Sequence, residues 1–257
     1  IAGSLPVLSG SGGGLSPVLD ASGLHLEAAR RTLMQLGGSD TALNASLRTV
    51  LLHRDGNLPE CERLLAEMLA LRDQWGELIP LNGRELDDSY LDATVLPLLE
   101  RTLEQAICAG LTRLSQSLPS GILEELADFA GELGHANGYG GKASPIAICA
   151  GLHTAPEETA EQLSYWRALI HLLTKDDGKW RSGFRSDWLG FEIDSADIAR
   201  LKNLAASLRE HDHVLAAIHA VRRLPPAKFP PEQWVVAKAL FRVLSRALVE
   251  LQLLFAE

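Results

Sequence analysis

The feature that most constrains this chain is a repeated spacing of apolar residues three and four positions apart. The longest such stripe runs through Leu96, Leu99, Leu103, Ile107, Leu111, Leu114 and Leu118, and this period matches one face of an α-helix. Shorter stripes occupy Leu64, Met68, Leu71 and Trp75, and the ranges 163–173, 201–218 and 240–255. Only 5% of the residues are aromatic, and a chain poor in rings but rich in Leu and Ala favours helix over sheet. We therefore expect an all-α, multi-helix fold with these stripes in the core.

The first residues and one internal segment depart from this helical pattern. Residues 1–23 are rich in Gly, Ser and Pro, which predicts a linker with a short extended piece that leads into one helical domain over residues 24–257. Residues 131–151 are rich in Gly and Ala with few periodic apolar positions, and they predict a loop. Because the chain starts at Ile1 and stops in an amphipathic stretch at Glu257, we expect it to be a piece excised from a longer protein.

Charge and cysteine content narrow the class of protein. A formal net charge of -9 argues against a protein that coats nucleic acid over its whole surface, although it leaves room for a local basic site. Cys61, Cys108 and Cys149 are odd in number and widely spaced, which predicts free thiols and a cytoplasmic location. The apolar runs are short and interrupted by charge, so we predict no membrane span and no membrane partner.

One stretch, residues 171–191, is basic and aromatic within this acidic chain. Its four cations are Lys175, Lys179, Arg181 and Arg185, and its three rings are Trp180, Phe184 and Trp188. Cations beside flat rings suit a phosphate backbone with bases stacked next to it. We predict a DNA-binding site made by the four cations, with Trp180 as a stacking partner. A structural interpretation, in which the rings fasten the loop to the core and the cations stay solvated, fits the composition equally well.

Other chemical motifs in the sequence are incomplete. The segment GYGGKA at residues 138–143 lacks the first Gly and the final Ser or Thr of a phosphate-binding loop. The spacing of His211, His213 and His219 does not place them on one helix face, which predicts solvated histidines and not a metal site. The acidic run at residues 85–88 predicts helix capping and not paired catalytic carboxylates. We therefore predict no catalytic, cofactor-binding or metal-binding residue in this chain.

Three stretches carry a resemblance to a known family. They are LLHRDGNLPECERLLAEMLALRDQW at residues 51–75, LLTKDDGKWRSGF at 172–184 and VELQLLFAE at 249–257. They resemble the helical 1B region of UvrD/Rep-type superfamily 1 DNA helicases, above all the bacterial helicase-nucleases of the exonuclease V beta subunit or AddA type. The opening segments IAGSLPVLSG and LSPVLD are similar to those that introduce this region, so the resemblance covers nearly the whole chain.

The resemblance implies a parent protein that hydrolyses ATP with Mg²⁺ to move along DNA and unwind it during recombinational double-strand break repair. This chain would then contact single-stranded or forked DNA, while the remaining motor domains carry the nucleotide motifs. A second nuclease or helicase subunit is a further implied partner. Two alternatives stay open, a helical scaffold that docks a partner subunit and an all-α enzyme with an unrecognised site. An exposed apolar helix face would favour the scaffold, and a deep pocket with convergent polar groups would favour the enzyme.

Overall fold

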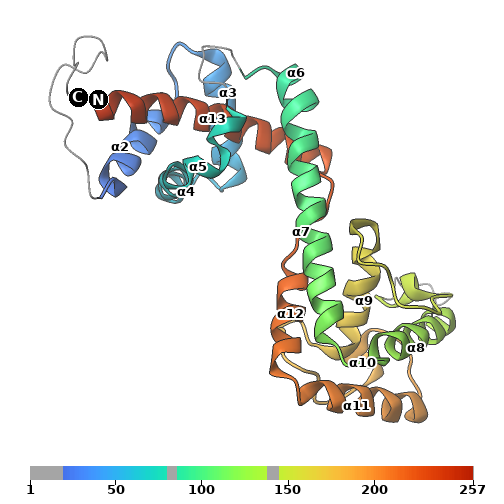
Figure 1. Cartoon of the computed structure of the whole chain (residues 1–257). Coiled ribbons are helices and arrows are strands. Elements are labelled where there is room, and N and C mark those ends of the chain that lie inside the picture. Colours follow the sequence, from blue (N-terminus) through green and yellow to red (C-terminus); the bar gives the residue numbers. More distant parts are fainter. Residues whose placement is uncertain (1–19, 80–85, 138–144, 257) are drawn as a thin grey trace. The chain divides into compact units, whose positions relative to one another are not determined.

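The computed structural model describes residues 20–79, 86–137 and 145–256, and these residues are predominantly helical (Figure 1). The predicted all-α class is confirmed, since the one β-type contact in the described ranges is an isolated bridge between Thr174 and Trp180. The chain divides into two compact units. Unit 1 comprises residues 1–97 and 229–257, and unit 2 comprises residues 98–228. The sequence had led us to expect one helical domain, because periodicity reports which face of a helix is buried but not which helices pack together.

Unit 1 is built around its last helix. Its helices are α2 (Ser22–Leu33), α3 (Thr41–His53), α4 (Leu58–Ala70), α5 (Arg72–Trp75), η2 (Gly76–Leu78), α6 (Asp88–Tyr90), the π-helix η3 (Leu91–Val95) and α13 (Pro231–Ala256). Helix α13 packs against α2, α3 and α4. Side-chain caps begin α3 and α4, because Asp40 accepts a hydrogen bond from the Leu43 amide and Asn57 accepts one from the Glu60 amide. Such caps satisfy amide groups that lack a partner in the first turn.

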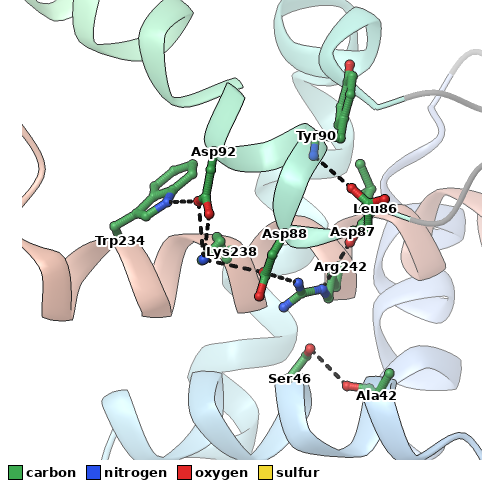
Figure 2. A network of polar contacts seen from close by, with 10 residues as sticks. All are labelled: Ala42, Ser46, Leu86, Asp87, Asp88, Tyr90, Asp92, Trp234, Lys238 and Arg242. Atoms are coloured by element: carbon green, nitrogen blue, oxygen red, sulfur yellow. Dashed lines mark hydrogen bonds and ion pairs between the residues drawn. The ribbon is translucent and has the colours of Figure 1, made fainter. Parts of the chain in front are cut away.

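A polar network joins the α6–η3 segment to α13 (Figure 2). Asp92 accepts a hydrogen bond from Nε1 of Trp234 at 2.7 Å and lies 3.2 Å from Nζ of Lys238. Asp88 pairs with Arg242 at 2.5 Å and with Lys238 at 3.3 Å. Hydrogen bonds from Arg242 to Asp88 and from Trp234 to Asp92 hold the pKa of each carboxyl below its ordinary value. The network therefore fastens two segments of unit 1 that are far apart in the sequence.

The predicted capping by the acidic run is confirmed for Asp87. Its side chain accepts a hydrogen bond from the backbone amide of Tyr90 at 2.7 Å, at the start of α6 (Figure 2). Glu85 lies outside the described residues, as do residues 1–19 of the linker predicted over residues 1–23. The last two residues of that range, Ser22 and Gly23, already belong to α2.

Unit 2 contains the longest apolar stripe and its own core. Its helices are α7 (Leu96–Ser117, of which residues 98–117 belong to this unit), α8 (Ile122–Asn137), η4 (Ala147–Cys149), η5 (Ala160–Gln162), α9 (Leu163–Leu173), α10 (Ser186–Leu189), α11 (Ser195–Arg209) and α12 (Asp212–Arg222). Ile107, Leu111 and Trp166 are buried together in this core. The indole of Trp166 donates to the carbonyl of Glu157 at 3.0 Å, so burial leaves its N–H group satisfied.

The predicted loop over residues 131–151 is wrong for its first part, because α8 continues to Asn137. Residues 145–146 form a turn, η4 follows, and residues 138–144 lie outside the described part of the chain. The glycines of α8 are needed for packing. A Cβ atom on Gly131 would lie 1.9 Å from the carbonyl oxygen of Leu152, and one on Gly134 would lie 2.6 Å from the amide of Ala150. Glycine in these positions lets another backbone segment lie close to the helix. A glycine-rich sequence usually predicts a loop, and this is why the sequence pattern missed the end of α8.

The three cysteines are free, as the sequence predicts. Cys61 and Cys149 are buried, and burial raises the pKa of the Cys149 thiol to about 11. Such a thiol is held in its unreactive, protonated form at neutral pH. None of the described helices is both long and apolar enough to cross a membrane.

Candidate nucleic-acid interface

The basic stretch begins with a tight turn at residues 174–181, directly after α9. The amide of Lys175 donates to the carbonyl of Lys179 at 2.9 Å, and the amide of Arg181 donates to Leu173 at 3.0 Å. Gly178 has a φ of +82°, and a Cβ atom there would lie 2.8 Å from Nε2 of His219. Glycine is therefore required at this position, both by the backbone conformation and by the neighbouring ring.

Side chains from α11 and α12 hold this turn by its backbone carbonyls. Arg222 donates to the hydroxyl of Thr174 and to the carbonyl of Asp176, each at 3.0 Å, and also to the carbonyl of Lys175. His219 lies with Nε2 2.7 Å from the carbonyl of Gly178. The guanidinium of Arg222 is favoured here because the turn follows the C-terminal end of α9, which carries partial negative charge. The turn is thus fixed by side chains as well as by its own hydrogen bonds.

Two of the five predicted DNA-binding residues present exposed cationic groups. The side chain of Lys179 is 79% exposed and lies 3.9 Å from Asp177, and that of Arg185 is 68% exposed and lies 3.1 Å from Asp187. Lys175 is half-buried on the same turn. Ion pairs between exposed side chains contribute little, about 0–1 kcal/mol. Lys179 and Arg185 can therefore exchange their carboxylate partners for a phosphate at small cost.

The other two predicted residues lie closer to the core. Trp180 is half-buried and packs against the core of unit 2. Arg181 is only 4% exposed, and its Nε donates to the carbonyl of His171 at 2.9 Å. Burial lowers the pKa of Arg181, the nearby charge of Asp176 opposes this shift, and the like charge of Arg222 adds to it. The sequence placed Arg181 among surface cations because burial cannot be read from a basic run.

Three further arginines near the turn were not predicted from the sequence. Arg167 donates to the carbonyl of Leu224 at 2.6 Å, Arg209 donates to the carbonyl of Arg181, and Arg222 has the partners given above. Within the described residues these three side chains bond neutral oxygens and form no ion pair. Arg167 lies in the helix that leads into the basic stretch, so a helical projection of residues 163–173 could have included it in the site. Arg209 and Arg222 are distant in sequence, and no local pattern connects them with the turn.

The predicted absence of a metal site was based on the three histidines. In the ranges that the structure describes, no group of three or more His, Cys, Asp or Glu could hold a metal ion. His213 is exposed and lies 3.2 Å from the carbonyl of Ser117, while His219 supports the turn. The segment 138–143 and the side chain of Trp188 lie outside the described residues.

Comparison with protein-family models, with curated proteins and with solved structures finds no match to this chain.

Proposed function

We propose that this chain is the DNA-contacting helical part of an ATP-dependent superfamily 1 DNA helicase that acts in recombinational double-strand break repair. Its ligand is single-stranded or forked DNA. Hydrolysis of ATP with Mg²⁺ belongs to the remaining motor domains of the parent, and a second nuclease or helicase subunit is a further partner. This chain supplies contact with the phosphate backbone and no chemistry of its own.

The observation that carries this proposal is a basic turn whose backbone is held by side chains, together with exposed cationic groups on the turn and just beyond it, at the start of α10. Lys179 and Arg185 have exposed charged groups, while Arg222 and His219 hold the backbone of the turn from another helix. Because the backbone of the turn is already held, only the exposed side chains need to be ordered when a phosphate binds. A motor that moves along DNA needs contacts of this kind because they do not depend on base sequence.

Arg181 and Trp180 are more buried than the other predicted residues, so the proposal gives them roles other than direct phosphate contact. Arg181 is a positioning residue, because its guanidinium holds the end of α9 from inside the protein. Trp180 can stack a base only through the part of its ring that the core leaves exposed. The electrostatic contacts of Lys175, Lys179 and Arg185 therefore provide most of the affinity.

Binding of fluorescein-labelled single-stranded and forked DNA over a salt series tests the proposal. We expect weak affinity that falls as salt rises, because each neutralised phosphate releases counterions. The double substitution Lys179→Ala with Arg185→Ala should weaken binding and reduce the salt slope for single strands by about 1.4, at about 0.7 per contact. The control is Arg113→Ala with Lys202→Ala, which removes two exposed cations of unit 2 outside the turn. Equal loss in both double variants would contradict a site at the turn.

A docking surface for the motor domains is the second candidate function, and unit 1 carries the observation that favours it. Leu253 and Phe255, in the last turn of α13, are 50% and 45% exposed. Phe255 borders a hollow of about 630 Å³ that Leu248 and Leu251 also line. Exposed apolar side chains beside a hollow are typical of protein contact sites.

Mixing the chain with the separately expressed remainder of its parent tests the docking function. Sedimentation should show a complex that Leu253→Ser with Phe255→Ser weakens and that Lys179→Ala with Arg185→Ala leaves intact. If the unmodified chain sediments alone, this second function is excluded.

A further inference from the structure

A small hollow of about 210 Å³ lies between two helices of unit 2. Arg167, Ile170 and His171 of α9 line it together with Arg222 of α12. The three residues of α9 are spaced at i, i+3 and i+4, so they share one face of the helix. The volume falls below the range of about 300–1,000 Å³ that is usual for sites of drug-sized ligands. The hollow therefore suits a single small group.

Within the part of the chain that the structure describes, neither arginine of the hollow forms an ion pair with a carboxylate. Among the described residues, Arg167 bonds only the carbonyl of Leu224, and Arg222 bonds a hydroxyl and two carbonyls. A guanidinium group has five N–H donors, so each side chain retains donors for another acceptor. Arg222 is half-buried, and a half-buried cation without a counter-ion attracts an anion more strongly than a solvated one does, because the local dielectric constant is lower. Arg167 is exposed and adds a second guanidinium group at the mouth of the hollow.

His171 forms part of the wall of the hollow. Its Nε2 lies 2.8 Å from the carbonyl of Leu189, which can only accept, and its Nδ1 lies 3.5 Å from Nη2 of Arg181, which can only donate. Because a carbonyl oxygen only accepts, Nε2 of His171 is the donor in the contact with Leu189. The fixed positive charges of the hollow are those of Arg167 and Arg222.

We propose that this hollow is a binding site for one phosphate group, held by Arg167 and Arg222. Guanidinium groups match the oxygens of phosphate in charge and in spacing, and they form short, charge-assisted hydrogen bonds with it. A phosphodiester of DNA and free inorganic phosphate share this chemistry. For the DNA backbone as the source, the inference rests on the proposed function. Arg222 would then both hold the basic turn and bind the phosphate beside it.

The test uses the full chain with Arg167→Gln. Arg167 is exposed and does not hold the turn, so this variant should keep the fold, which circular dichroism can check. The control is Arg113→Gln, which removes an exposed arginine of the same unit outside the hollow. One measurement titrates inorganic phosphate by calorimetry, with chloride at matched ionic strength as the reference. The other measures affinity for single-stranded DNA over a salt series.

We expect the unmodified chain and Arg113→Gln to bind inorganic phosphate and Arg167→Gln to lose this binding at least tenfold. In the DNA assay Arg167→Gln should lower the salt slope by about 0.7, the value for one phosphate contact. Phosphate binding that needs Arg167, without any DNA binding, would support the site for free phosphate while the proposed function fails. DNA binding that Arg167→Gln leaves unchanged, together with no phosphate binding, would overturn the inference and spare the proposed function.

Discussion

At the scale of single residues, two glycines decide how closely α8 can lie to the segment at residues 146–152. Gly131 and Gly134 leave room for backbone atoms where any other residue would place a Cβ atom. The cost of this freedom is modest, since glycine inside a helix is less favourable than alanine by about 1 kcal/mol. The close approach buries Ile146 and Cys149 against the core of unit 2.

Gly131→Ala should therefore destabilise the protein even though alanine is the better helix former. The added Cβ would meet the carbonyl oxygen of Leu152 at 1.9 Å, so the backbone must move, at a cost of about 1–3 kcal/mol. Gly23→Ala in α2 is the matched control, because nothing lies within 4 Å of its added Cβ, and it should stabilise by up to about 1 kcal/mol. Urea unfolding of both variants measures the difference, and equal effects would contradict the packing role of Gly131.

The same scale shows where sequence reasoning about the site stops. The charged groups of Lys179 and Arg185 are exposed, as is usual for long charged side chains, and DNA binding by them stays a prediction. Arg181 follows the same pattern in sequence yet is buried. Its Nε donates to a carbonyl of α9, and Arg209 of α11 donates to its backbone carbonyl. The spacing of residues along the sequence does not predict contacts between segments that are far apart in the chain.

At the scale of helices and turns, the basic turn depends on Arg222 more than on any residue within it. Arg222→Ala should remove its bonds to Thr174, Lys175 and Asp176 and destabilise unit 2 by about 1–3 kcal/mol. Arg222→Lys should restore little, because an ammonium group lacks the planar fork that reaches several acceptors. Hydrogen exchange should then become faster at the amides of Gly178 and Arg181, which bond within the turn. Unchanged exchange at both amides would show that the turn holds itself.

The α6–η3 network of unit 1 predicts a loss of stability in acid. The pKa values of Asp88 and Asp92 lie below their ordinary value of 3.8 in the folded chain, so the unfolded chain binds protons first as the pH falls. The stabilisation is complete well above pH 3.8 and is lost as the pH drops through the lowered values. Unfolding in urea between pH 7 and pH 3 should show a flatter pH dependence for Asp88→Asn with Asp92→Asn.

The control for the acid experiment is Asp73→Asn, which changes an exposed carboxyl of the same unit that makes no ion pair among the described residues. This variant should keep the pH dependence of the unmodified chain. A pH dependence that survives the double substitution in full would place the acid-sensitive groups elsewhere.

Helical periodicity predicts some buried faces and not others. In α9 the predicted stripe is buried throughout, at Leu163, Trp166, Ile170 and Leu173. In α4 the predicted stripe is shifted, because the buried residues are Cys61, Leu65 and Leu69, while Leu71 is half exposed. Leucine or methionine stands on both sides of α4, at residues 64, 65, 68 and 69. A helix with two apolar faces does not reveal which one meets its neighbours, so only packing decides.

At the scale of the whole molecule, each unit has a core of its own. Leu69 is buried with Leu248 in unit 1, and Leu111 is buried with Trp166 in unit 2. Leu→Ala substitutions at such sites cost about 2–5 kcal/mol. We expect Leu69→Ala to speed hydrogen exchange in unit 1 alone and Leu111→Ala to do so in unit 2 alone. Equal acceleration in both units after either substitution would mean that the chain unfolds as one cooperative body.

The helix α13 has a consequence for the way this protein is made on the ribosome. Its partners α2, α3 and α4 emerge early, but residues 98–228 must be translated before α13 can join them. At about 5–20 residues per second, this interval lasts on the order of ten seconds. Meanwhile unit 2 is continuous in sequence and can fold as soon as it leaves the exit tunnel. We therefore expect unit 2 to fold before unit 1 during synthesis. Until α13 is made, the apolar faces of α2, α3 and α4 stay exposed and can bind chaperones.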